Sequence, residues 1–127
     1  MFGRKKKALP AGTRLMHYEG LPGFNQDMPC FMEQTAEALI FRQVDGPTGT
    51  LPLEKLTGVE VLAEYQFAAK YRGNDIITSK TNAVKWYAVL TYSEDKRLVF
   101  WTLGVKEINA LRDLQKQVRN SVQDFTL

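Results

Sequence analysis

The sequence predicts a mainly β domain that ends in one amphipathic helix. Short runs of alternating apolar and polar residues, separated by turn formers, recur from Thr13 to Leu103. After Gly104 the apolar residues recur at three- and four-residue steps instead, which is typical of a helix with one buried face. The composition, with 44% hydrophobic and 24% charged residues, is that of a folded chain. We therefore expect a flexible basic arm over residues 1–12 and a single domain over residues 13–127.

The predicted strands follow one another at hairpin spacing. Alternation predicts strands over residues 13–18, 30–34, 38–43, 51–53, 57–64, 84–92 and 97–103, and it is compatible with a strand over residues 65–71. Two pairs of these are expected to form hairpins, namely 30–34 with 38–43 and 84–92 with 97–103. Pro52 lacks the N–H that a central strand donates, so its strand is predicted at an edge of the sheet.

Three turn-forming segments separate these strands. Residues 19–29 contain two glycines, two prolines, Asn25 and Asp27, which predicts a long loop. Residues 45–49 read Asp-Gly-Pro-Thr-Gly and predict a turn, because Pro presets one backbone angle and Gly tolerates a positive φ. The polar residues 72–83 predict a second long loop.

The C-terminal helix is predicted to begin near Lys106, with Gly104 as its N-cap and Glu107 in its first turn. At 3.6 residues per turn it would be about five turns long. Its apolar face is formed by Ile108, Leu111, Leu114, Val118, Val122 and Phe125. We expect this face to cover an open end of the β core, because removing apolar surface from water contributes roughly 25 cal/mol per Å².

Three stretches of the chain carry a resemblance to a known group. They are LPLEKLTGVEV at residues 51–61, the aromatic hairpin from Trp86 to Trp101, and the terminal helix. In this order they resemble pleckstrin-homology-like domains, and the chain is most similar to the small bacterial members, which are related in shape to GRAM domains. The resemblance covers most of residues 13–125. It implies a partly open barrel of two packed antiparallel sheets, with about seven strands, capped by the helix.

Signatures of enzymes are missing from the sequence. Residues 20–23 (GLPG) are not followed by the Gly-Lys-Ser/Thr of a phosphate-binding loop, and there is no dinucleotide fingerprint. Cys30 is the only cysteine, so no thiolate zinc cluster is available, and His17 is the only histidine that could activate it as a nucleophile. We expect His17 to be a hydrogen-bonded strand histidine and Cys30 a buried apolar side chain. We predict no catalytic residue, no metal and no cofactor.

The net charge of +3 arises from one short run at the N-terminus. Arg4, Lys5, Lys6 and Lys7 carry four positive charges, and the rest of the chain has 13 basic and 14 acidic residues. Three interpretations stay open for this run: a contact with an anionic membrane, a nucleic-acid-binding arm without sequence preference, or a solubilising terminus.

A second candidate anion site lies beside the loop over residues 72–83. It consists of Lys70, Arg72, Lys80 and Lys85, with Lys70 and Arg72 expected on one strand face. The alternative is a solvated edge whose lysines prevent strand-to-strand aggregation. The resemblance to pleckstrin-homology-like domains implies a phosphoinositide site in the loop joining the first two strands. Here residues 19–29 contain Glu19 and Asp27 and no Lys or Arg, so phosphoinositide binding through that loop is not expected.

The same loop contains apolar residues among its turn formers. Leu21, Phe24 and Met28 are candidate contacts for a protein partner if they are exposed; otherwise Phe24 folds back on the mouth of the barrel. The C-terminal Phe125 and Leu127 pose the same choice and would suit a self-association surface.

These observations predict a non-enzymatic binding or scaffolding module that recognises a protein partner, with homo-oligomerisation left open. The alternative is a peripheral binder of an anionic surface, either membrane lipid or nucleic acid, through the basic N-terminal run. The basic start has no apolar run behind it and no stretch reaches membrane-spanning length, so a cytoplasmic location is expected. A role as a subunit of a phage or mobile-element assembly also remains open.

Overall fold

The computed structural model describes residues 12–44, 46–71 and 85–123, with side chains described as far as residue 119. The elements, in chain order, are β1 (Thr13–Glu19), β2 (Met28–Gln34), β3 (Ala38–Arg42), β4 (Thr48–Pro52), the 3-10 helix η1 (Leu53–Lys55), β5 (Leu56–Ala63), α1 (Glu64–Tyr71), β6 (Trp86–Tyr92), β7 (Lys96–Thr102) and α2 (Val105–Gln123). None of the helices in these ranges is both long enough and apolar enough to cross a membrane.

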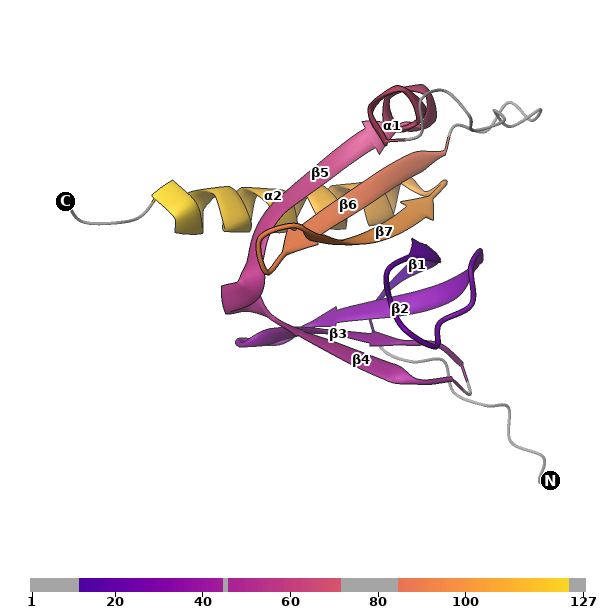
Figure 1. The fold of residues 1–127 in the computed structure, drawn as a ribbon, viewed down its shortest axis with the longest axis horizontal. Coiled ribbons are helices and arrows are strands. Elements are labelled where there is room, and N and C mark those ends of the chain that lie inside the picture. Colours follow the sequence, from indigo (N-terminus) through magenta and orange to yellow (C-terminus); the bar gives the residue numbers. More distant parts are fainter. Residues whose placement is uncertain (1–11, 45, 72–84, 124–127) are drawn as a thin grey trace.

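The seven strands form one antiparallel sheet in the order β4-β3-β2-β1-β7-β6-β5. Neighbouring strands in the sheet are consecutive in the sequence except β1 and β7, so β1 pairs with both β2 and β7, and β4 and β5 lie at the two ends of the sheet. Figure 1 shows the β1–β4 half of the sheet and the β5–β7 half at an angle to each other, with α2 packed against the sheet. The predicted mainly β fold with a C-terminal helix is therefore confirmed, as are the two predicted hairpins and the edge position of the strand that contains Pro52.

The main hydrophobic core lies between the inner face of the sheet and α2. Phe41 of β3 and Phe100 of β7 stack with ring centroids 5.2 Å apart, although these strands are three places apart in the sheet order. From α2, Ile108, Leu111 and Leu114 are buried, as the helical spacing predicted. The helix also protects the sheet edge, because the side-chain Nε2 of Gln115 donates to the carbonyl of Val59 in the terminal strand β5 at 2.8 Å.

The segment 65–71 is helix α1 and not a strand, so that prediction was wrong. Glu64, Phe67, Ala68 and Tyr71 are spaced at three and four residues, and the first three are buried. Tyr65, which the strand interpretation placed on the same face as Phe67, is 69% exposed. A run of seven residues is short enough to fit both the strand period and the helix period, and the surface available for packing selects the helix. Phe67 stacks on Tyr87 of β6 with ring centroids 4.2 Å apart.

Helix α1 covers a second hydrophobic cluster on the outer face of the sheet. Its fully buried members are Phe67, Tyr87, Val89 and Val99. Because β6 is covered by α2 on one face and by α1 on the other, its residues Tyr87 to Leu90 form an uninterrupted buried run.

The bounds of one strand and one loop also differ from the prediction. Strand β4 begins at Thr48, inside the predicted turn at 45–49, and the first long loop is shortened to residues 20–27.

We expect Leu111→Asp to abolish the cooperative folding of the domain. Leu111 is 1% exposed against the sheet, and its replacement by a carboxylate removes core packing and buries an unpaired charge, at a cost of more than about 4 kcal/mol. Urea unfolding followed by far-UV circular dichroism measures this loss. The control, Asn109→Asp, introduces the same group at an exposed position of the same helix and should change stability by less than about 0.5 kcal/mol. A wild-type unfolding midpoint for Leu111→Asp would contradict the described packing of α2.

Candidate functional site

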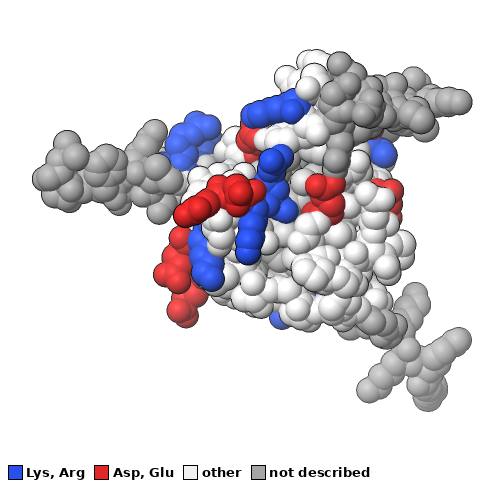
Figure 2. Space-filling model, in the orientation of Figure 1, with Lys and Arg blue, Asp and Glu red and all other residues white. Residues whose placement is uncertain are grey.

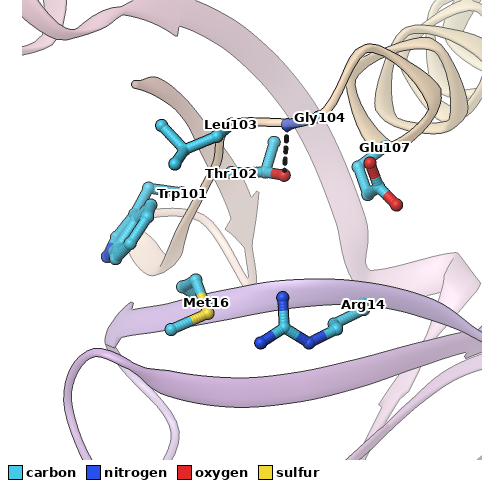
Figure 3. A pocket seen from close by; sticks show the side chains of 7 residues that line it. All are labelled: Arg14, Met16, Trp101, Thr102, Leu103, Gly104 and Glu107. Atoms are coloured by element: carbon cyan, nitrogen blue, oxygen red, sulfur yellow. Dashed lines mark hydrogen bonds between the residues drawn. The ribbon is translucent and has the colours of Figure 1, made fainter. Parts of the chain in front are cut away.

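A groove of about 350 Å³ opens where β1, the end of β7 and the start of α2 meet (Figure 3), and we call it the β1–α2 groove. Its lining residues are Arg14, Met16, Trp101, Thr102, Leu103, Gly104 and Glu107. They come from β1, near the N-terminus, and from the end of β7 and the start of α2, which follow each other near the C-terminus. The groove exists because β1 pairs with β7, which brings the first strand beside the segment that leads into the last helix.

Strand alternation places the two β1 residues on the same side. Leu15 between them is completely buried in the main core, so Arg14 and Met16 point to the opposite face of the sheet. Met16 stands opposite Trp101 in the β1–β7 register. The Trp101 indole is fixed from two directions: its Nε1 donates to Asp27 Oδ1 at 2.8 Å, and Lys85 Nζ lies 4.3 Å from its ring centroid. The aromatic wall of the groove is therefore held in place.

The other wall is formed by the turn into α2. The amide of Gly104 donates to Thr102 Oγ1 at 3.1 Å, the bond drawn in Figure 3, and its carbonyl accepts the amide of Ile108 at 3.1 Å. Gly104 thus occupies the N-cap position that the sequence predicted. A Cβ at Gly104 would come within 1.9 Å of Glu107 Oε1, so glycine is what lets that carboxylate fold back over the turn.

The groove combines exposed apolar side chains with both signs of charge. Leu103 is 53% exposed at its lip, and the adjacent Val105 is 72% exposed. Arg14 lies on the strand side and Glu107 on the helix side, as Figure 3 shows. Among the described residues no group of three or more His, Cys, Asp or Glu side chains could hold a metal ion. Apolar surface with charged groups at both sides is suited to binding a polypeptide segment.

The predicted partner contacts in the first loop lie in different environments. Phe24 is buried in the main core, and Leu21 is half-buried against it, so this part of the loop folds back onto the molecule. Met28 is 49% exposed and lines, with Val44, a small pocket of about 170 Å³. Of the three predicted contacts, Met28 is the one that presents a large apolar surface to a partner. Partner binding through this loop stays a prediction.

The structure describes two of the predicted anion contacts, and both are engaged within the protein. Lys70 lies on α1 and pairs with Glu60 of β5, so the expected strand face shared by Lys70 and Arg72 was wrong. Lys85 lies over the Trp101 ring. On the face of the molecule drawn in Figure 2, Lys and Arg side chains lie next to Asp and Glu and do not form one basic patch. The remaining predicted contacts, Arg4, Lys5, Lys6, Lys7, Arg72 and Lys80, lie outside the described residues, as do Phe125 and Leu127.

Glu60 connects β5 to α1. It accepts hydrogen bonds from Lys70 Nζ and Tyr71 Oη, and the guanidinium of Arg97 lies 5.1 Å from the Tyr71 ring centroid. Burial alone would raise the pKa of Glu60, but the hydrogen bonds from Lys70 and Tyr71 outweigh burial and lower it. The Glu60 carboxylate therefore stays ionised at pH values at which an ordinary glutamate becomes protonated. It holds α1 to β5 through these two hydrogen bonds.

His17 and Cys30, the residues with the chemistry closest to catalysis, are both buried. His17 is 3% exposed, and both of its ring nitrogens are hydrogen-bonded to the backbone of the loop over residues 20–27. Cys30 is completely buried in the main core, and burial raises the pKa of its thiol to about 12. Neither side chain lines the β1–α2 groove.

The Cys30 thiol should be inert in the folded protein. At about pH 8 a free thiol is partly ionised and reacts with aromatic disulfide reagents, whereas a thiol with its pKa raised to about 12 and no exposed surface does not. We expect no labelling of the native protein and labelling of one thiol per chain in guanidinium chloride. Rapid labelling under native conditions would contradict the described position of β2.

The sequence analysis did not single out the β1–α2 groove. Trp101 was predicted to lie in the aromatic hairpin and Gly104 to be an N-cap, but Arg14 and Met16 belong to no motif. The β1–β7 pairing brings these residues together. It joins strands that are far apart in the sequence, so no local sequence pattern predicts it.

Comparison with known proteins gave no match to a family model, to a curated protein or to a solved structure.

Proposed function

We propose that this chain is a non-enzymatic binding module that holds a segment of a partner protein in the β1–α2 groove. The observation that carries the proposal is the pair of exposed apolar residues, Leu103 and Val105, beside a groove whose Trp101 wall is fixed by two contacts. Exposed apolar side chains at a preformed concavity are typical of interaction sites rather than of a solvated turn. The small exposed surface favours a short segment over a large globular interface.

The charges in the groove indicate the chemistry of the occupant. Arg14 on the β1 side favours a carboxylate, and Glu107 on the α2 side favours a basic side chain. Between them Met16 and Trp101 offer an apolar surface. The proposed occupant is therefore an extended segment with one large apolar residue between an acidic and a basic side chain.

We also propose that the sheet belongs to the pleckstrin-homology-like class. An order in which the first strand joins two halves of the sheet, followed by one C-terminal helix on the inner face, supports the assignment. In that arrangement the two halves act as the packed sheets of a partly open barrel, and β4 and β5 lie on either side of its opening. Helix α1 would then be an insertion after β5.

The alternative function, binding of an anionic membrane or nucleic acid through Arg4–Lys7, gains no support from the described residues. The two described members of the second anion site are already engaged, Lys70 by Glu60 and Lys85 by Trp101. Sedimentation with anionic vesicles at low and high salt, with residues 2–7 deleted as the control, separates this alternative from partner binding.

Selection from a random peptide display library tests the groove directly. We expect enriched peptides to share an apolar residue between acidic and basic residues, and Leu103→Asp to weaken their binding by about tenfold or more, which corresponds to about 1.4 kcal/mol. Arg14→Glu should weaken the same peptides. The matched control Lys55→Glu makes the same charge change on exposed η1 and should leave binding unchanged.

Two results would contradict the proposed partner. Enriched peptides that bind wild type and Leu103→Asp equally would place the site elsewhere. A wild-type dimer in light scattering that Leu103→Asp converts to a monomer would identify the occupant as a second copy of this chain.

A further inference from the structure

The loop over residues 20–27, between β1 and β2, is closed by side chains that reach it from the strands. His17 contributes both ring nitrogens: Nδ1 lies 3.2 Å from the carbonyl of Asn25, and the amide of Leu21 donates to Nε2 at 3.2 Å. Gln43, just after β3, accepts from the amide of Asn25 at 3.2 Å and donates to its carbonyl at 3.3 Å. The backbone of the loop is thus held at Leu21 and at Asn25.

The two contacts of His17 define its protonation state. An amide N–H can donate only to a nitrogen that carries no proton, so Nε2 is bare and the proton of the neutral ring is on Nδ1, where it donates to Asn25. A second proton on Nε2 would face the N–H of Leu21, and this hydrogen bond would be lost. The imidazolium would also be buried, since the ring is 3% exposed between Phe24 and Phe100, whose centroids lie 5.7 and 6.0 Å away.

Burial of the ring opposes protonation more strongly than the neighbouring groups favour it. Phe24, Phe100 and Gln43 are neutral, and Asp27 is the charged group among the described residues whose field favours the imidazolium. Its carboxylate is already bonded to Trp101 Nε1. Burial lowers the pKa of His17 below its ordinary value of 6.5, and the bond to Asn25 and the charge of Asp27 reduce this effect without reversing it.

We propose that the loop over residues 20–27 is an acid-opened latch, held closed by neutral His17, whose protonation releases Leu21 and exposes the apolar side chain of Phe24. The closed loop binds only the neutral ring, whereas the open loop leaves the ring in water with its ordinary pKa. Closing is therefore fully favoured above about pH 6.5 and weakens as the pH falls, by up to about tenfold per pH unit. The latch does not depend on the occupant proposed for the β1–α2 groove.

Amide hydrogen exchange measured by NMR as a function of pH tests this latch in the full chain. The protection factor of the Leu21 amide, which corrects for the pH dependence of intrinsic exchange, should fall by up to about tenfold per pH unit below about pH 6.5. The amides of β6 should keep their protection over the same range, because the opening is local. Binding of an apolar fluorescent dye should rise over the same pH range, because Phe24 becomes exposed when the loop opens.

Two variants separate the latch from other acid effects. His17→Gln has no titrating group, so Leu21 protection should become independent of pH between about 4.5 and 7.5, whatever its absolute value. Asp27→Asn keeps His17 but removes the charge that favours the imidazolium in the closed loop, so the onset near about pH 6.5 should stay and the total loss of Leu21 protection at low pH should become larger. The latch is overturned if Leu21 protection in wild type is constant with pH, if it falls equally in His17→Gln, or if the β6 amides lose protection together with Leu21.

Discussion

The pairing of β1 with both β2 and β7 is the contact on which the rest of this structure depends. Every other neighbouring pair in the sheet joins strands that are consecutive in the sequence. Without the β1–β7 ladder, the β1–β4 half and the β5–β7 half would be two separate meanders, each with one face of its apolar residues in water. The stacked rings of Phe41 and Phe100, one from each half, lie in the core that this ladder closes.

The β1–α2 groove and the closed loop over residues 20–27 both follow from the way β1 side chains alternate between the two faces of the sheet. Its inward residues, Leu15 and His17, enter the core, and the end of the strand places His17 under the loop over residues 20–27. Its outward residues, Arg14 and Met16, form one wall of the β1–α2 groove. Gly20 makes this exit possible: a Cβ there would come within 2.5 Å of the Arg97 carbonyl, and its φ of 113° suits only glycine. The Asp27 bond to Trp101 links the loop to the groove wall.

Local chemistry made most of the fold predictable from the sequence. The hairpins, the edge strand and α2 follow from periodicity, from the missing N–H of Pro52 and from the apolar spacing of Leu111 and Leu114, none of which depends on distant contacts. Helix α1 was missed because its short run fits two periods, and only the outer-face partner Tyr87 selects one. His17 was predicted to be hydrogen-bonded, but its partners depend on where the loop folds. The groove could not be predicted, since Arg14 and Glu107 meet only through the β1–β7 ladder.

Native-state hydrogen exchange in low concentrations of urea tests most directly whether β1 unites the two halves. If it does, the hydrogen-bonded amides of β1 exchange only through global unfolding, with the same free energy and the same urea dependence as those of β6 and β7. Exchange of β1 and β2 at a clearly lower free energy, while β6 and β7 remain protected, would show that the two halves unfold independently and would contradict this account.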